Sequence, residues 1–425
     1  MLIEFRVKNF RSFKDEAMFS LVASSAHKEH QDTHVVSLPA DAPFKVPGLL
    51  RSAVVYGANA SGKSNLLRAI QLMRGLVVES SSLSPGHKLN LQPFLLDEKT
   101  KGQPIEMEIT FLKDNIRYQY GFKANADRIL SEWLLVYLTK KPQTWFSREF
   151  DPETSEDKYV FRTGLQGQRD VWRSATRPNA LFLSTAVQLN SSQLRPVFDW
   201  ISNLVVFERG GAPGFEHTVE HILKNPINQV QSLLRAADIG IANIDIDTRK
   251  MQTGGFKIDP QTGKLEALPT ENRDLKIPLF RHQSPHGSAV FELGDESDGT
   301  ERLFSLAGPL FEIMRDGRVI CVDELDRSLH PLLVRQLVQM FHDPSINTGG
   351  AQLVFTTHDT SLLSADILRR DQIWFTEKTF EQSSRLYPLT DFSARRGEAF
   401  EKGYLTGRYG AIPILNPNEV QTRGQ

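Results

Sequence analysis

The sequence predicts an α/β fold in which a parallel sheet carries a phosphate-binding loop and an antiparallel meander accompanies it. Residues 52–56 form a short apolar strand that leads into the glycine-rich segment 57–64 and then into a helical pattern. Two further apolar strands, 318–322 and 352–357, follow late in the chain and would join the same sheet. Three strand-like segments within residues 105–138 predict the meander.

The composition is that of an ordinary globular protein of two or three structural units. Of the 425 residues, 40% are hydrophobic and 24% are charged, and the formal charge is −1. A chain without net positive charge cannot bind nucleic acid through its overall charge, and binding through a local basic groove is the alternative that this leaves. The single cysteine, Cys321, excludes an internal disulfide framework and fits a reducing compartment. The charged N-terminus and the lack of any 18-residue apolar stretch predict a cytoplasmic protein with no membrane partner.

The remaining elements follow in chain order. Residues 2–7 alternate as a strand does, and a polar stretch separates them from the strand at 52–56. Helical periodicity marks the segments 64–78, 188–202, 218–237, 300–314 and 331–342. Residues 143–180 show no clean period, and 252–275 are typical of an exposed loop or hairpin. We therefore predict an N-terminal lobe at 1–140, a compact helical or irregular insert at 141–280 and a C-terminal lobe at 281–425.

The segment 57–64 reads GANASGKS, a complete G-x-x-x-x-G-K-S motif between a strand and a helix. Its glycines let backbone N–H groups surround phosphate oxygens, Lys63 reaches the β- and γ-phosphates, and the Ser64 hydroxyl ligates Mg²⁺. The flanking strand and helix outweigh the alternative of a chance glycine-rich turn. ATP and Mg²⁺ are thus the predicted ligands. The residues expected to contact the nucleotide are Gly57, Asn59, Ala60, Ser61, Gly62, Lys63, Ser64 and Asn65.

Acidic residues end the strand at 318–322. Asp323 would hold Mg²⁺ through water, and Glu324 would polarise the attacking water. Buried strands that end in acids also form structural ion pairs, but the phosphate-binding loop favours the catalytic role. The next strand ends at His358, which would reach the γ-phosphate from the same parallel sheet. A capping or surface histidine is the alternative.

A third motif lies where the helix at 300–314 begins. Ser297, Asp298 and Gly299 combine a hydroxyl, a carboxylate and a glycine N–H at the positive end of that helix. Such a helix start can bind an anion. A plain N-cap is the competing interpretation, and the two are compatible.

In their order these motifs resemble the ABC-type ATPases of the SMC and RecF group. They resemble more closely the AAA-labelled, ABC-like ATPases of bacterial anti-phage and abortive-infection systems, the RloA-like family related to the ATPase half of OLD proteins. The likeness extends from residue 1 to about 415 and includes the stretches YGANASGKSNLL, ESDGTERL, DELDRSLHP, TTHD and YLTGRYGAIP.

The resemblance implies several further roles. The segment Ser297-Asp298-Gly299 would be a signature motif that contacts the γ-phosphate of ATP held by a second subunit, so that ATP is sandwiched in a homodimer or higher homo-oligomer. It also implies a nucleotide contact at Arg11, for which a surface turn is the alternative. Gln92 is the candidate for a Q-loop residue that senses Mg²⁺.

Departures from the family pattern narrow the expected function. Without a CxxC hook or heptad run, long coiled-coil arms are not expected. About 60 residues follow His358, too few for the Toprim nuclease domain of OLD proteins, so we expect any nuclease or toxin to be a separately encoded effector. The hypothesis is an ATPase that regulates such an effector in anti-phage defence. The alternative is a RecF-like repair ATPase that binds DNA.

Overall fold

The computed structural model describes residues 1–39, 46–208, 214–225, 229–237, 240–253, 256–258, 265–267, 271–392 and 399–413. The chain forms two compact units. The first consists of residues 1–211, 313–327 and 334–425, and the second of residues 212–312 and 328–333. The predicted boundaries at residues 140 and 280 therefore differ from those of the units, because the first unit continues through the beginning of the predicted insert.

A six-stranded sheet in the first unit has the strand before the phosphate-binding loop near its middle. In spatial order its strands are β11 (Val205–Phe207), β17 (Val319–Val322), β18 (Gln352–Thr356), β5 (Ser52–Gly57), β19 (Ile373–Lys378) and β20 (Ser384–Pro388). All neighbours are parallel except β19 and β20. The predicted parallel sheet is thus confirmed. Since parallel strands end at one edge, the loops that follow β5, β17, β18 and β19 gather there.

A seven-stranded antiparallel sheet is the second layer of this unit. Its order is β10 (Glu156–Phe161), β9 (Gln143–Asp151), β8 (Ile129–Tyr137), β7 (Ile116–Ala124), β6 (Ile105–Lys113), β1 (Leu2–Lys8) and β2 (Ala17–Ser20). Strands β6 to β8 confirm the predicted meander. Residues 143–161 were expected in the insert but continue the sheet, because Trp145 and Phe146 of β9 turn into its core.

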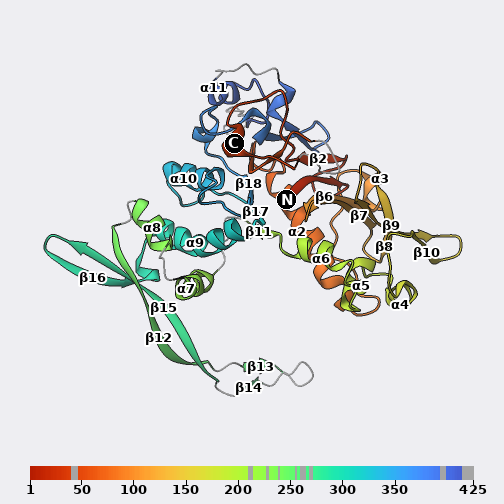
Figure 1. The fold of residues 1–425 in the computed structure, drawn as a ribbon, viewed down its shortest axis with the longest axis horizontal. Coiled ribbons are helices and arrows are strands. Elements are labelled where there is room, and N and C mark those ends of the chain that lie inside the picture. Colours follow the sequence, from red (N-terminus) through yellow and green to blue (C-terminus); the bar gives the residue numbers. More distant parts are fainter. Residues whose placement is uncertain are drawn as a thin grey trace, which may run out of the picture. The chain divides into compact units, whose positions relative to one another are not determined.

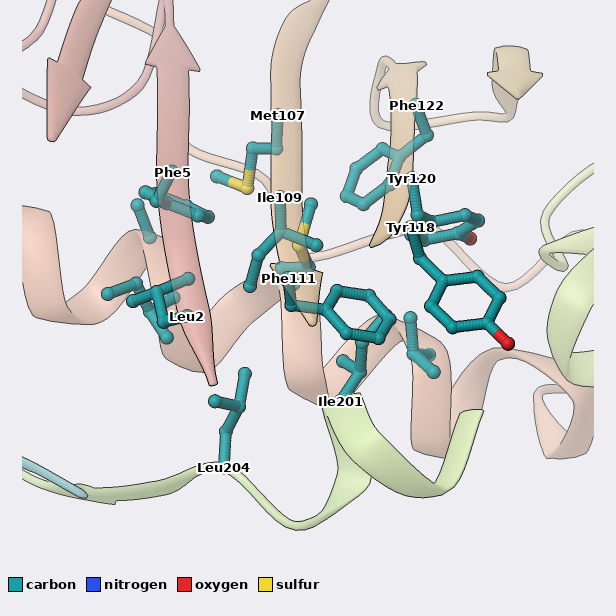
Figure 2. Packing of buried hydrophobic residues seen from close by; sticks show 14 of the residues in the cluster. Leu2, Phe5, Met107, Ile109, Phe111, Tyr118, Tyr120, Phe122, Ile201 and Leu204 are labelled. Carbon is teal, nitrogen blue, oxygen red and sulfur yellow. The ribbon is translucent and has the colours of Figure 1, made fainter. Parts of the chain in front are cut away.

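The core of the first unit packs this sheet against helices. Figure 2 shows side chains of β1, β6 and β7 converging, with Ile201 and Leu204 closing the cluster from below. The phenyl ring of Phe111 stacks on the indole of Trp200, with 4.0 Å between centroids. Helix α2 (Lys63–Glu79) contributes Leu66, Ile70 and Met73 to the same cluster. Burial of one such side chain stabilises the fold by about 1.5–3 kcal/mol, and this packing fixes the helix that starts at the phosphate-binding loop.

Two predicted helices are each broken in two. The segment 188–202 contains the end of α5 (Phe182–Gln188) and all of α6 (Arg195–Ser202), and Asn190 between them adopts a left-handed φ of 65°. The segment 218–237 is divided into α7 (Phe215–Lys224) and α8 (Gln229–Ala236). Asn225 is extended there because it precedes a proline in the sequence, and a proline disfavours helical dihedrals in the residue before it.

The second unit is less helical than the predicted compact insert. Its strands β12 (Ile241–Thr253), β15 (Glu271–Ser284) and β16 (Gly287–Glu292) form an antiparallel sheet, and Figure 1 shows β12 and β15 as a long pair. Helix α7 packs on α9 (Asp298–Asp316) within this unit, and the Thr218 hydroxyl donates to the Phe304 carbonyl at 2.7 Å. The predicted loop or hairpin at 252–275 lies partly outside the described residues and includes the short pair β13 (Phe256–Ile258) and β14 (Leu265–Ala267).

Helix α10 (Pro331–His342) matches its predicted bounds. The other short elements are α1 (Gln31–His34), β3 (Val35–Val36), β4 (Leu49–Leu50), α3 (Glu98–Lys101), α4 (Arg169–Ala175) and α11 (Phe400–Leu405). In the part of the chain that the structure describes, none of the helices is long and apolar enough to cross a membrane.

Candidate functional site

A pocket of about 400 Å³ surrounds the loop after β5, a size usual for small-molecule sites. Its lining residues are Arg11, Ser12, Asn59, Ala60, Ser61, Gly62, Lys63, Ser64, Asn65, Arg68, Glu324, His358 and Lys378. The pocket thus joins the loop after β1, the phosphate-binding loop, the residues that follow β17 and β18, and the end of β19. Four of its side chains are cationic groups and one is a carboxylate, so the pocket favours an anionic ligand.

The phosphate-binding loop is held close to its neighbours. Gly62 has a φ of 121°, and a Cβ there would lie 2.3 Å from Oγ of Ser384 in β20. Only glycine fits this position, and the loop backbone stays open to a ligand. The Ser61 hydroxyl forms a hydrogen bond with the Thr376 hydroxyl of β19 at 2.7 Å.

Lys63 is the first residue of α2, and its Nζ donates to the carbonyls of Gly57 at 2.7 Å and Ala58 at 3.2 Å. Burial lowers the pKa of Lys63 to about 8, although the carboxylates of Asp323 and Glu324 oppose this shift. An ammonium that has lost its water at the positive end of a 17-residue helix is a strong site for phosphate oxygens.

Two oxygen ligands for a divalent cation meet beside this loop. The Ser64 hydroxyl donates to Oδ1 of Asp323 at 3.0 Å, and Asp323 is buried at the end of β17. A hydroxyl and a carboxylate at this distance are the donors that Mg²⁺ prefers, and Mg²⁺ keeps several of its waters in such sites. The two residues therefore fit the predicted metal role.

Gln92 does not line the pocket. Its side chain is exposed, and its backbone carbonyl accepts a hydrogen bond from the N–H of Arg11 at 2.7 Å. Gln92 thus supports the loop that contains Arg11. Its side chain is not among the residues that line the pocket around Ser64, where the predicted contact with Mg²⁺ would place it. The Arg11 backbone is left-handed, with a φ of 50°, and its side chain lines the pocket.

A threonine hydroxyl positions both acidic residues. Thr356, the last residue of β18, donates to Oδ1 of Asp323 at 2.7 Å and accepts from the N–H of Glu324 at 2.8 Å. Glu324 has a φ of 53°, which leaves its side chain in the pocket. The N–H of His358 donates to Oδ2 of Asp326 at 3.2 Å, and burial together with Lys63 lowers the pKa of His358. His358 is therefore neutral at pH 7.

Sequence reasoning missed three residues of this site, namely Arg68, Thr356 and Lys378. Ser12 and Arg68 belong to one chain of hydrogen bonds, because Nδ2 of Asn65 donates to Oγ of Ser12 at 2.7 Å and Arg68 donates to Oδ1 of Asn65 at 3.0 Å. The helical spacing of Asn65 and Arg68 was visible in the sequence, but nothing linked either residue to Ser12.

The segment Ser297-Asp298-Gly299 lies in the second unit, at the start of α9. The Ser297 hydroxyl accepts the N–H of Thr300 at 3.2 Å, so the N-cap interpretation is confirmed. Ser297 and Asp298 are exposed. A Cβ on Gly299 would lie 2.7 Å from the Ser328 carbonyl, and this contact keeps the segment against the residues that follow Arg327.

One family model matches the part of the chain that carries the motifs. The family model described as "AAA domain, putative AbiEii toxin, Type IV TA system" matches residues 52–364, which contain the phosphate-binding loop, both acids and His358. Among solved structures, the crystal structure of the SmcHead bound to the C-winged helix domain of ScpA is similar at 13% sequence identity and a TM-score of 0.37. That similarity covers 91% of this chain and 97% of the other. No curated protein matches the chain.

Proposed function

The chain belongs to the AAA-domain family whose description names the AbiEii toxin and type IV toxin–antitoxin systems, and we propose that it binds ATP with Mg²⁺ and hydrolyses it. The observation that carries the proposal is the pocket in which Lys63, Glu324 and His358 meet. These residues come from three segments of the sheet edge. Phosphoryl transfer to water requires a cation, a general base and a hydrogen-bond donor at the γ-phosphate, and these are the roles that we assign to the three side chains.

Binding of the triphosphate would use the loop backbone and one ammonium. The N–H groups of the loop and of the first turn of α2 surround the phosphate oxygens, and Lys63 exchanges its bonds to the Gly57 and Ala58 carbonyls for phosphate oxygens. Ser64 and Asp323 would hold Mg²⁺, whose charge neutralises oxygens of the β- and γ-phosphates.

Hydrolysis would use Glu324 to orient a water molecule and accept its proton. The water oxygen bonds to the γ-phosphorus while the bond to the bridging oxygen of ADP breaks. Thr356 fixes Glu324 for this task through its bond to the Glu324 N–H. Neutral His358 donates a hydrogen bond to a γ-phosphate oxygen, and Lys63 balances the negative charge in the transition state.

We propose that the catalytic assembly contains two copies of the chain. Ser297 and Asp298 are exposed at the positive end of a 19-residue helix, which suits contact with the γ-phosphate of ATP held by another subunit. The Ser297 hydroxyl forms hydrogen bonds with the N–H of Thr300 at 3.2 Å and with the Thr300 hydroxyl at 2.9 Å, so contact with a phosphate would require it to exchange its bond to the Thr300 hydroxyl.

The cellular role that we propose is regulation of a separately encoded nuclease or toxin in cytoplasmic anti-phage defence. The family description supports this setting, and the ATP site gives the chain two states that can act on a partner. Within the described residues, no group of three or more His, Cys, Asp or Glu side chains is arranged to hold a metal ion.

The described residues support RecF-like DNA binding less well than they support regulation of an effector. Two arginines on the long strands of the second unit form ion pairs with carboxylates. Arg249 lies 2.7 Å from a carboxylate oxygen of Glu292, and Arg281 lies 3.4 Å from one of Asp245. Paired cations release fewer counterions from a DNA backbone than free ones do.

The test compares ATP binding and hydrolysis in the wild type, Lys63→Ala and Glu324→Gln. We expect Lys63→Ala to lose both activities, because the transferring phosphoryl group loses its principal cation. Glu324→Gln should bind ATP at wild-type affinity, hydrolyse it at least about 100-fold more slowly and accumulate as an ATP-bound oligomer on size exclusion. Wild-type turnover in Lys63→Ala would overturn the proposal.

A further inference from the structure

The strand that ends at Lys378 lies on the opposite side of the phosphate-binding strand from the hydrolytic residues. Strand β5 pairs with β18 on one flank and with β19 on the other. Glu324 and His358 follow β17 and β18, so the γ-phosphate must lie toward that flank. Lys378 comes two residues after Thr376, which pairs with Gly57 on the other flank. A nucleotide with its γ-phosphate near Glu324 thus extends its opposite end toward Lys378.

The ammonium of Lys378 lines the pocket without a counterion. Its Nζ donates to the Gln382 carbonyl at 2.7 Å, and no carboxylate among the described residues pairs with it. Burial lowers the pKa of Lys378. Two of its three N–H donors remain for a ligand.

A second lysine beside the same hairpin shows the contrast. Nζ of Lys14 lies 2.9 Å from a carboxylate oxygen of Asp97 and 2.7 Å from one of Glu381, at the tip of the β19–β20 hairpin. Acidic side chains are therefore available near this hairpin, but they neutralise the lysine outside the pocket. The lysine inside the pocket keeps its charge for an incoming anion.

The backbone around Lys378 is tied to the phosphate-binding loop. In β20, the N–H of Ser384 donates to the Ser12 carbonyl at 2.6 Å, and its hydroxyl donates to the Ser61 carbonyl at 2.5 Å. The hairpin turn is closed by a bond from the N–H of Thr379 to the Ser383 carbonyl at 2.8 Å. Lys378 therefore has a fixed position relative to the loop, which reduces the entropy lost when it binds a ligand.

We propose that Lys378 binds the α-phosphate end of the nucleotide and so contributes to affinity for ATP and ADP alike. The inference rests on the proposed ATP site and assigns a residue to the end of the ligand that does not react. Lys63, by contrast, serves the phosphates that react. Lys63 thus binds the β- and γ-phosphates, and Lys378 binds the α-phosphate end on the β19 flank of β5.

The test measures dissociation constants of MgATP and MgADP by calorimetry for the full chain and three variants. Lys378→Gln should weaken both nucleotides by about 10- to 100-fold, the usual effect of one hydrogen bond between charged groups. Lys378→Arg should restore most of the affinity. Arg385→Gln removes a cation from the same hairpin, outside the pocket, and should change affinity by less than about twofold.

The outcomes separate this inference from the proposed function. Unchanged binding in Lys378→Gln, or a loss confined to ATP, would overturn the role at the α-phosphate end. If the wild type binds neither nucleotide, the proposed function fails instead. Melting temperatures without nucleotide give the second readout. Lys378→Gln should melt no lower than the wild type, because it removes an uncompensated ammonium, and a lower melting temperature with unchanged affinity would assign Lys378 a structural role only.

Discussion

At the scale of single residues, the hydroxyl of Thr356 connects Asp323, the proposed metal ligand, with Glu324, the proposed general base. It is fully buried and serves Asp323 as a donor and Glu324 as an acceptor. Thr356→Val keeps the shape but leaves the Glu324 N–H without its partner. We expect a loss of about 1–3 kcal/mol in the free energy of unfolding, measured in urea, and a larger fall in kcat than in ATP affinity.

Thr356→Ser is the matched control, because it keeps the hydroxyl and loses only a methyl group. It should retain most of the hydrolysis rate. Wild-type kcat in the valine variant would show that Glu324 keeps its position without this bond.

The pKa of Lys63 makes nucleotide affinity depend on pH. Phosphate oxygens favour the ammonium, so binding raises this pKa above its free value of about 8. Below pH 8 Lys63 is charged in both states and contributes no pH dependence to the affinity. Above pH 8 the free chain must take up a proton to bind, and affinity should fall by up to about tenfold per pH unit.

Calorimetry at pH 8.5 in buffers of different ionisation enthalpy measures that proton directly. We expect net uptake, and the same sign in Lys378→Gln, which removes the other lysine whose pKa burial lowers. Proton release, or none, would mean that Lys63 is already fully charged in the free pocket.

The sequence predicted the residues whose spacing defines a motif, and it missed those placed by the fold. Lys63, Ser64, Asp323 and Glu324 belong to local patterns that imply their chemistry. Lys378 reaches the pocket because β19 returns to the phosphate-binding strand from the far end of the chain. Gln92 was predicted to contact Mg²⁺, but its side chain does not line the pocket. A loop residue can contribute its backbone instead of its side chain, and the Gln92 carbonyl does so by accepting the N–H of Arg11.

At the scale of elements, strong patterns were predicted within a residue or two and weak ones were not. Helix α10 and strands β6 to β8 have clear periods and followed them. Strands β9 and β10 were missed because their faces are both partly exposed, which blurs the alternation of apolar and polar residues. The two predicted helices are interrupted at Asn190 and at Asn225, which precedes a proline. The helical periodicity of the surrounding residues hid these local signals in the sequence.

Two glycines at and within α2 should respond in opposite directions to alanine. Gly75 lies inside the helix with open space around it, so Gly75→Ala should raise the free energy of unfolding by about 0.5–1 kcal/mol with no change in ATP hydrolysis. Gly62→Ala introduces a clash with Ser384 and a strained φ, so it should lower both stability and ATP binding. Urea unfolding and calorimetry measure both effects, and equal responses at the two sites would contradict the described loop geometry.

At the scale of the whole molecule, the proposed two-copy assembly predicts rescue by mixing. Ser297→Arg damages the segment offered to a partner, and Lys63→Ala damages the loop that holds ATP, so each should be inactive alone. A mixed dimer holds one intact composite site, and an equal mixture should therefore recover up to about a quarter of wild-type hydrolysis.

Each variant alone is the control, and size exclusion with ATP follows the formation of the mixed dimer. Mixed dimers that form but stay inactive would show that the site is complete within one chain.

The proposal that a separate effector carries the nuclease or toxin activity predicts how the isolated chain behaves. Expressed alone, the chain should be non-toxic and should hydrolyse ATP without cleaving DNA or RNA, and binding of its effector should depend on Lys63. Robust nucleic-acid cleavage by the purified chain that is lost in Lys63→Ala would place the killing chemistry in this protein.

The position of β5 between β18 and β19 also determines when a newly made chain can first bind ATP. About 300 residues separate Gly57 from the start of β19, which takes a ribosome roughly 15–60 s to synthesise. The antiparallel sheet and α2 lie within the first half of the chain and can fold during that interval, whereas the buried strand β5 still lacks both neighbours. Incomplete products of interrupted translation would therefore carry the loop sequence without the ability to bind ATP.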